Sequence, residues 1–345
     1  MASEYDLVPA RSVDEGRLIR FAKAVWPDHP SPQRILSLWW RYAEPDCAFA
    51  AIHAPTATMA ALGAARPCEW VVAGRVYPPA AIGDWYVDPA HEGKLLGRRL
   101  LRHLTVPDRI TLAFSISDVA VAYVSRLGWV GPYASSLLAL PLPRLAQIFS
   151  PRPSRHGLAM EEHDIGMGGA LGSLGRDLDR IEADRIDGAA RMRRGADEWS
   201  WRLSVCGERR YRFSVAHRAG RPVGYVTVRL MMPGSSRMLG KIAGALITDL
   251  VAVNDDAQAL RALAGRAVQL AAELRAGVVL MTTTNPAHVG ALTACGFLSP
   301  AFPLLGRFLA RRAPVFMWVP DGPAADFKPD NVVFTFADSD VDLNL

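Results

Sequence analysis

A short stretch of this chain combines an acidic residue, glycines and basic residues in an order that could bind an anion. Residues 84–101 read DWYVDPAHEGKLLGRRLL. The alternating aromatic start is typical of a strand that ends at Val-Asp-Pro, and the leucines among basic residues indicate a helix. The first N–H groups of a helix have no partner within it and attract phosphate. The stretch therefore predicts a phosphate-binding turn between a strand and a helix.

Two kinds of residue would contribute to this turn. Gly93 and Gly97 would let the backbone approach an anion because they carry no side chain. Lys94, Arg98 and Arg99 would add positive charge near the start of the helix. A Gly-x-x-x-Gly spacing also occurs in ordinary loop and helix packing, so a purely structural interpretation stays open.

The elements that would hold this turn occur twice along the chain. The segment IGDWYV in the first half matches ITDLVA in the second, which aligns Asp84 with Asp249. The segment SISDVAVAYVSRLGW matches TTTNPAHVGALTACGF, which aligns Gly128 with Gly296. Both halves predict a strand, a helix, a second strand and a second helix in the same order. We therefore expect a duplicated domain of mixed α/β type.

Composition and proline-rich segments suggest where the domains begin and end. The chain has 345 residues, which is enough for two domains, and half of them are hydrophobic. We expect a first domain over 1–145, a linker over 146–159, a second domain over 160–318 and a tail over 319–345. The tail carries six aspartates against one lysine. We expect it to be acidic and solvated, with an added edge strand from NVVFTF as the alternative.

The order of these motifs resembles the GNAT acyltransferases. The resemblance rests on a strand ending in Val-Asp-Pro, a two-glycine loop that opens a helix, a further strand, and a helix ending in Leu-Gly-aromatic. It implies two tandem GNAT-like domains of α/β (α+β) class, each a mixed, mostly antiparallel sheet flanked by helices, as in proteins of the mycothiol synthase type. The family loop usually reads Arg/Gln-x-x-Gly-x-Gly/Ala, whereas this chain has Glu92 and Leu95 at two of those places.

The resemblance implies an acyl-coenzyme A site in the first domain, with acetyl-coenzyme A as the expected cosubstrate. The loop and the helix start would hold the pyrophosphate, and the strand backbone would pair with the pantetheine arm. The start of the next helix could also touch the cofactor. The residues assigned to cofactor binding are Tyr86, Val87, Glu92, Gly93, Lys94, Leu95, Leu96, Gly97, Arg98, Arg99, Ser117 and Asp118.

The second half lacks these features. No glycine precedes its corresponding helix, and Asp255 and Asp256 would repel a pyrophosphate. Acidic residues in a first helical turn are also what an ordinary helix favours. We therefore expect the second domain to be degenerate for cofactor binding.

Asp84 is the candidate catalytic residue. Acyl transfer to an amine requires a base that takes the amine proton, and acids near this place on the strand resemble amine-orienting or base residues in some family members. A structural role for Asp84, which its repeat partner Asp249 could share, is the alternative. The tyrosine that often acts as the acid in this family is absent, because Val124 and Leu292 stand at its two positions.

The predicted function is transfer of an acyl group, with acetyl as the expected one, from acyl-coenzyme A to the primary amine of a small molecule. An amino sugar or an amino acid derivative is the expected kind of acceptor. A non-catalytic coenzyme A-binding or scaffold protein is the competing class. FemABX-like aminoacyl transfer is the second alternative, against which the lack of a long helical hairpin insertion argues.

Several other classes fit the sequence poorly. The formal net charge of +5 is modest and no dense Lys/Arg run occurs, so nucleic acid is not an expected partner. The sequence contains no run of about 18 apolar residues, so we expect no membrane span. The four cysteines and eight histidines show no metal-ligand spacing. We expect a cytoplasmic monomer or homodimer that needs no metal.

Overall fold

The computed structural model describes residues 4–27, 48–77, 80–105, 109–114, 116–133, 135–141, 157–166, 168–186, 188–205, 210–234, 239–299, 315–319, 327, 332–335 and 337. The chain divides into two compact units. Unit 1 comprises Met1–Trp70, Val76–Pro132 and Val315–Phe327. Unit 2 comprises Val71–Arg75, Tyr133–Pro314 and Lys328–Leu345.

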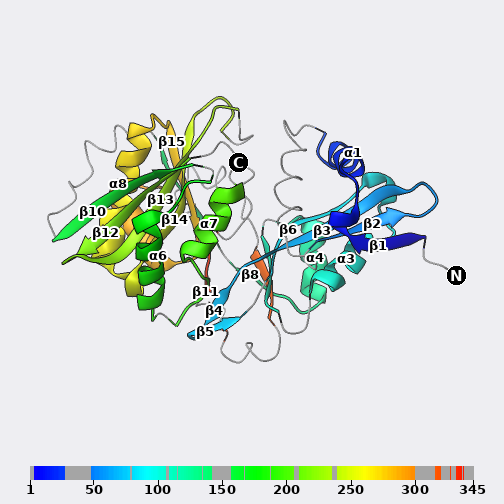
Figure 1. Ribbon diagram of the computed structural model, residues 1–345, viewed down its shortest axis with the longest axis horizontal. Coiled ribbons are helices and arrows are strands. Elements are labelled where there is room, and N and C mark those ends of the chain that lie inside the picture. Colours follow the sequence, from blue (N-terminus) through cyan, green and yellow to red (C-terminus); the bar gives the residue numbers. More distant parts are fainter. Residues whose placement is uncertain are drawn as a thin grey trace. The chain divides into compact units, whose positions relative to one another are not determined.

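Unit 1 is built on a seven-stranded sheet in the order β1-β2-β3-β6-β7-β16-β8 (Figure 1). The pairs β1–β2, β2–β3, β3–β6 and β7–β16 are antiparallel, and the β6–β7 pair is parallel. The sheet is therefore mixed and mostly antiparallel, as expected from the sequence. The strands are β1 (Tyr5–Pro9), β2 (Ala48–His53), β3 (Thr58–Pro67), β6 (Ala80–Val87), β7 (Thr111–Phe114), β8 (Val130–Tyr133) and β16 (Val315–Trp318).

The α-helices described in unit 1 are α1, α3 and α4. In α1 (Glu15–Val25) the side chain of Asp14 accepts a hydrogen bond from the backbone N–H of Arg17, which satisfies one free donor at the helix start. α3 (Leu96–Leu104) follows β6, and α4 (Asp118–Arg126) follows β7. The spacing of the leucines gives α3 one apolar face, and its buried residues are Leu96, Leu100, Leu101 and Leu104.

Successive side chains of β6 lie on opposite faces of the unit 1 sheet. The indole Nε1 of Trp85 donates a hydrogen bond of 2.8 Å to the carbonyl of Gly97 in α3. The next residue, Tyr86, makes an edge-to-face contact with Trp26 at the end of α1, with 4.5 Å between ring centroids. α1 and α3 therefore cover opposite faces of the sheet (Figure 1).

Unit 2 contains a six-stranded sheet in the order β10-β12-β13-β14-β15-β9. Its β14–β15 pair is parallel and its other pairs are antiparallel. The strands are β9 (Ser136–Pro141), β10 (Leu158–Ile165), β12 (Tyr211–Arg218), β13 (Arg221–Met231), β14 (Gly244–Ala252) and β15 (Val278–Thr283). A four-stranded sheet has the order β17-β11-β4-β5, from β4 (Trp70–Val72), β5 (Arg75–Tyr77), β11 (Ala190–Met192) and β17 (Val332–Val333).

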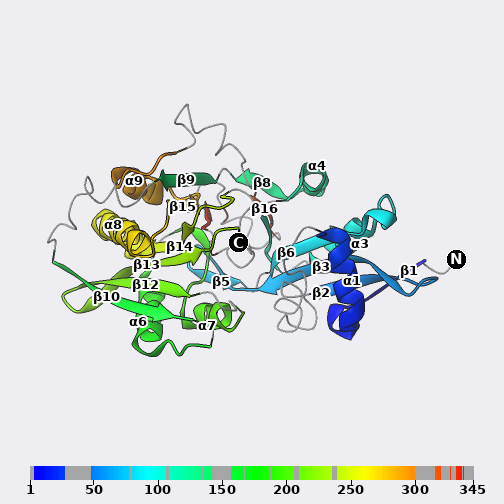
Figure 2. The ribbon, with the colours of Figure 1, turned by 90° about the horizontal axis from the view of Figure 1, so that it is seen from above.

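Two pairs of helices cover the six-stranded sheet (Figure 2). α6 (Gly172–Asp184) and α7 (Ala196–Val205) lie on one face, and α8 (Ala257–Glu273) and α9 (Pro286–Ala294) lie on the other. The side chains of β12, β13 and β14 alternate between a core under α6 and α7 and a core under α8 and α9. Because both faces of these strands are buried, β14 is apolar along almost its whole length.

The repeat inferred from the sequence is visible in the strand register. In unit 1 the β3–β6 pairing skips Gly83 and resumes at Asp84. In unit 2 the β13–β14 pairing skips Thr248 and resumes at Asp249. A skipped residue of this kind is a β-bulge. The alignment of Asp84 with Asp249 is therefore confirmed.

The units differ from the expected ranges 1–145 and 160–318 at two strands. β9 precedes the expected end of the first domain, yet it pairs with β15 in the sheet of unit 2. β16 falls at the expected end of the second domain, yet it pairs with β7 in the sheet of unit 1. Backbone groups at a strand edge bind any chain segment that reaches them, so the sequential order of strands does not fix their partners.

Parts of the predicted organisation fall outside the described residues. These parts are most of the expected linker over 146–159 and most of the acidic tail over 319–345. Within the tail, Val332–Val333 is a strand, in agreement with the alternative of an added strand from NVVFTF. In the described part of the chain, no helix is both long and apolar enough to cross a membrane.

Candidate functional site

The two parallel strands of unit 1 pair only at their beginnings. Ala80, Ala81 and Ile82 of β6 pair with Thr111–Ala113 of β7, and no pairing between these strands continues beyond Ile82 among the described residues. The bulge at Gly83 comes immediately after this point. We refer to the place where the two strands stop pairing as the β6–β7 divergence. A place where two parallel strands part is one at which an extended ligand could add to a sheet.

The predicted turn leads from this divergence into α3. The side chain of Asp88 accepts a hydrogen bond of 2.9 Å from the N–H of Ala90 and so closes the first part of the turn. Gly93 and Leu95 then adopt left-handed conformations, with φ of +79° and +57°. Glycine adopts this conformation without strain, whereas Leu95 does so as the residue that caps α3.

The N-terminus of α3 has no capping side chain. Among the described residues, the backbone N–H groups of 93–98 have no hydrogen-bond acceptor. Glu92, Gly93, Lys94, Leu95 and Arg98 are exposed at this end of the helix. Free N–H groups and the positive end of the helix dipole together favour a bound anion. Gly93, Lys94, Leu95 and Arg98 therefore fit the pyrophosphate role that the sequence predicts for them, whereas the Glu92 carboxylate would repel a phosphate and its predicted cofactor role stays a prediction.

The structure gives two of the predicted loop residues additional packing contacts. A Cβ on Gly97 would lie 3.2 Å from the indole nitrogen of Trp85, so any other residue there would require the indole to shift by a few tenths of an ångström. The guanidinium of Arg99 donates to the carbonyl of Tyr5 over 3.3 Å and thereby contacts β1. These packing contacts of Gly97 and Arg99 are observed, whereas their roles in cofactor binding stay predictions.

The remaining predicted site residues lie on β6 and at the start of α4. Asp84 is in β6 directly after the bulge. Tyr86 is 37% exposed, and Val87 is half-buried. At α4, the hydroxyl of Ser117 accepts the N–H of Ala120, so Ser117 is the helix cap. The predicted roles of Asp84, Tyr86, Val87, Ser117 and Asp118 in catalysis or cofactor binding stay predictions.

The corresponding place in unit 2 has the same strand geometry. Pairing between β14 and β15 is described only from Gly244 to Leu246 on β14, and the bulge at Thr248 follows. We call this place the β14–β15 divergence. Asp249, which corresponds to Asp84, is 2% exposed.

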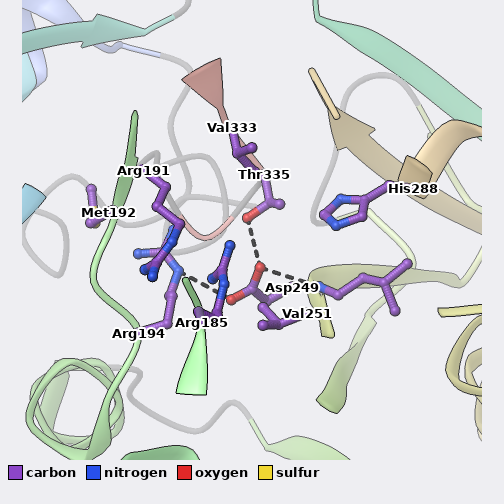
Figure 3. A pocket seen from close by; sticks show the side chains of 10 residues that line it. Arg185, Arg191, Met192, Arg194, Asp249, Val251, His288, Val333 and Thr335 are labelled. Carbon is purple, nitrogen blue, oxygen red and sulfur yellow. Dashed lines mark hydrogen bonds and ion pairs between the residues drawn. The ribbon is translucent and has the colours of Figure 1, made fainter. Parts of the chain in front are cut away.

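Asp249 is held by three side-chain donors from distant segments of the chain. It accepts hydrogen bonds from Arg194 Nε at 3.1 Å and from the Thr335 hydroxyl at 3.0 Å (Figure 3), and a third from the Tyr225 hydroxyl at 2.7 Å. Trp199 Nε1 in turn donates to the Tyr225 hydroxyl over 3.2 Å. A buried carboxylate with these partners is well compensated. These contacts compensate the burial of the Asp249 carboxylate within unit 2.

The helix start that follows β14 is occupied by an acidic side chain of the chain itself. The Oδ1 atom of Asp256 accepts hydrogen bonds from the backbone N–H of Gln258 at 2.9 Å and from that of Ala259 at 3.0 Å. It also accepts a hydrogen bond from Arg218 at 2.6 Å. The Arg218 contact, with the backbone bonds, holds the pKa of Asp256 below its usual range. A permanent negative charge therefore stands where unit 1 offers free N–H groups to an anion.

A small polar pocket surrounds Asp249 in unit 2 (Figure 3). Arg191 forms a buried ion pair with Glu182, which also accepts the backbone N–H of Arg194 at 3.2 Å. The sequence analysis did not identify this cluster, although the arginine-rich run RIDGAARMRRG carries several of its members. The pocket is lined by Arg185, Arg191, Met192, Arg194, Asp249, Leu250, Val251, His288, Val333 and Thr335.

His288 makes unit 2 sensitive to acid. Burial lowers the pKa of its imidazole from 6.5 to about 4, against the opposing effect of Asp255 and Asp249 and with a smaller contribution from Arg185. The imidazole Nδ1 lies 3.0 Å from the Thr283 hydroxyl. As the pH falls from 6.5 towards 4, the unfolded chain binds a proton that the folded chain excludes. Stability is therefore lost in this window.

Between pH 7 and pH 5, protonation of His288 in the unfolded chain should lower the free energy of unfolding of the wild type by about 2 kcal/mol. We expect His288→Gln to abolish this part of the loss. Urea unfolding of both proteins at the two pH values measures this difference. His103→Gln, at an exposed position of α3, is the control for replacing a histidine by glutamine. Equal pH dependence in the His288 variant and the wild type would contradict the assignment.

One group of side chains in unit 2 has atoms close enough to share a cation. Ligand atoms of Glu161, Asp177 and His217 all lie within 4.8 Å of one another. His217 Nε2 is 3.1 Å from Asp177 Oδ2, and this direct contact already accounts for the proximity of His217 and Asp177. The expectation that the protein needs no metal stays a prediction.

The comparisons with known proteins support the fold. No family model and no curated protein matches the chain. A GCN5-related N-acetyltransferase from Kribbella flavida matches with 15% identity and a TM-score of 0.56, over 93% of this chain and 72% of that one. A tandem GNAT protein from the clavulanic acid biosynthesis pathway matches with 16% identity and a TM-score of 0.55, over 91% and 98%. Saccharomyces cerevisiae N-myristoyltransferase with bound myristoyl-CoA matches with 12% identity and a TM-score of 0.53, over 96% and 82%.

Proposed function

Because the chain has the tandem GNAT-like fold, we propose that it is an N-acyltransferase that takes acyl-coenzyme A at unit 1. The expected acyl group is acetyl, and the expected acceptor is the primary amine of a small molecule. The amine nitrogen would attack the thioester carbon, the carbon–sulfur bond would break, and the amine proton would leave through a base.

The observation that carries this proposal is the start of α3 in unit 1, where the backbone N–H groups of 93–98 have no hydrogen-bond acceptor among the described residues. The pairing of β6 with β7 ends at Ile82, and the turn after β6 leads to the N-terminus of α3, which has no capping side-chain hydrogen bond. An extended pantetheine arm could pair with the strand while its pyrophosphate met the N–H groups of 93–98. The exposed Lys94 and Arg98 would add attraction for the phosphates.

The contrast with unit 2 supports placing the cofactor in unit 1 only. Asp256 already fills the helix start in unit 2, and Arg218 keeps it charged. Asp249 is engaged by Arg194 and Tyr225 in a buried cluster. A second pyrophosphate would have to displace a carboxylate from two backbone donors and an arginine. Each of these charge-assisted bonds contributes about 1.5–3 kcal/mol.

Asp84 is our candidate for the residue that receives the amine proton. It follows the bulge on β6 and precedes by two residues the exposed Tyr86, which contacts Trp26 on the α1 face. Strand alternation places positions 84 and 86 on the same face. The backbone N–H groups that the bulge frees next to Gly83 could polarise the thioester carbonyl.

We expect calorimetry of the full chain with acetyl-coenzyme A to give one binding site per chain. An assay for free thiol with a panel of small primary amines then tests transfer. Two equivalent sites would contradict the assignment of the cofactor to unit 1, and no binding at all would contradict the proposed function.

A non-catalytic coenzyme A-binding protein is the alternative that one observation favours. The position of the tyrosine that often acts as the general acid in this family holds Val124, a completely buried residue of α4. The adjacent Tyr123 instead packs near Trp85, with 6.1 Å between ring centroids. Binding of acetyl-coenzyme A without thiol release from any amine would favour this alternative.

A further inference from the structure

The C-terminal segment Val332–Thr335 is paired on both of its edges within unit 2. On one side it forms a parallel ladder with β11, in which Val332 pairs with Ala190 and Val333 with Arg191. On the other side it meets the end of β15, where Thr335 forms an antiparallel bridge with Thr283.

The pairing of β15 shows where this segment lies. One edge of Thr283 is occupied by Ser136 of β9, so Thr335 must meet the opposite edge, which faces β14. The hydroxyl of Thr335 also donates to Asp249 of β14 over 3.0 Å. The segment therefore lies in the β14–β15 divergence, with a contact to each of the two strands (Figure 3).

Specific contacts hold the segment in this place. The N–H of Thr284 donates to the carbonyl of Phe334 over 3.1 Å, and the N–H of Phe334 donates to the Thr284 hydroxyl over 2.8 Å. The Thr284 hydroxyl also bonds the carbonyl of Val332 at 2.5 Å. Phe334 is completely buried and contacts Tyr133 edge to face, and Val332 is 5% exposed. The segment thus combines backbone pairing with buried apolar side chains.

We propose that the β14–β15 divergence is a binding site for an extended peptide, and that its resident ligand is the chain's own segment Val332–Thr335. Strand addition of this kind takes its affinity from main-chain hydrogen bonds and its specificity from side-chain pockets. Here Thr335 supplies the specific polar contact through Asp249, and Phe334 supplies the main apolar contact.

This inference explains the difference between the two units. The peptide occupies in unit 2 the place that the pantetheine arm is proposed to occupy in unit 1, and this comparison rests on the proposed function. The peptide site itself does not depend on it, because every contact that defines it lies in unit 2.

The first experiment cuts the C-terminal segment from the rest of the chain after the protein has folded. A protease site introduced within 321–326 leaves the full chain covalently intact until it is cut. We expect the released C-terminal fragment to stay bound through gel filtration in the absence of denaturant. We also expect a synthetic peptide of residues 331–337, NVVFTFA, to displace it. A fragment that elutes separately from a remainder with an unchanged melting temperature would overturn the proposal.

A variant pair tests the polar contact. Thr335→Val in the synthetic peptide removes the hydroxyl donated to the Asp249 carboxylate, and it should weaken binding by roughly 10-fold or more, as expected for a hydrogen bond to a charged group. Thr335→Ser keeps the hydroxyl and should bind nearly as well as the native peptide. Equal affinity of all three peptides would mean that the peptide does not bind through the Thr335–Asp249 hydrogen bond, which contradicts the proposed site.

Hydrogen exchange covers the case in which the cut chain does not remain folded. In the full, uncut chain, Thr335→Val should speed exchange of the amides of Thr284 and Phe334, while amides of the unit 1 strand β3 stay unchanged. Unaltered exchange at Thr284 and Phe334 would count against the proposal. Titration of the uncut wild type with acetyl-coenzyme A is a separate measurement, so failure of the proposed function would be recognised independently.

Discussion

Gly93→Asp should abolish the binding of acetyl-coenzyme A while leaving the fold of both units intact. Gly93 has φ of +79°, and a Cβ built on it would meet no atom within 4 Å. The added carboxylate would be close to the free N–H groups of 93–98, where the phosphates are proposed to bind. Placing like charges together costs several kcal/mol, so affinity should fall by at least roughly 100-fold. Calorimetry measures the loss.

A matched variant separates charge repulsion from backbone strain. Gly220, in the turn between β12 and β13, has φ of +77° and equally open surroundings. Gly220→Asp therefore introduces the same side chain and the same strain in unit 2. It should lower the melting temperature about as much as Gly93→Asp and leave cofactor affinity unchanged. Equal loss of affinity in both variants would show that the loop at Gly93 does not hold the phosphates.

Asp84→Asn should lower turnover by roughly 100-fold or more, which is the usual effect of losing a general base. The amide keeps the size and most of the hydrogen bonding of the carboxylate, but it cannot take the amine proton. Affinity for acetyl-coenzyme A should change little, because the cofactor is proposed to be held by the β6 backbone and the turn 88–95. Steady-state kinetics with saturating cofactor, together with calorimetry, measure the two effects separately.

The repeat partner of Asp84 provides the control. Asp249→Asn leaves Arg194 without its buried counter-charge, and breaking a buried ion pair costs about 3–5 kcal/mol. The variant should therefore lose stability, and its turnover per folded molecule should stay near that of the wild type. If Asp84→Asn also lost stability and kept its turnover, Asp84 would be structural, and the amine proton would leave through water or the substrate.

Much of the local structure was determined by the sequence alone. The leucines among basic residues predicted the helix that follows the turn, and the structure has it as α3, beginning at Leu96. The internal repeat predicted the equivalence of Asp84 and Asp249, and the two β-bulges confirm it. These features depend on neighbours within a few turns or on direct similarity between segments. Local sequence contains that information.

The partners of two strands were decided only by the tertiary structure. β9 and β16 each have an apolar pattern that any strand edge could accept, and each pairs with a strand from the other expected domain range. Strand pairing depends on which backbone edge is open in the folded molecule. A period of two residues along one strand says nothing about the identity of its neighbour.

The roles of the two aspartates also separated only on folding. Asp84 and Asp249 occupy equivalent places, but Asp249 is joined there by Arg194, 55 residues earlier, and by Thr335, 86 residues later. No local pattern connects residues so far apart, because the contact exists only after several elements pack around the carboxylate. The sequence thus identified the strand position in both halves. The tertiary structure decided that in unit 2 this position belongs to a buried polar cluster and a bound C-terminal segment.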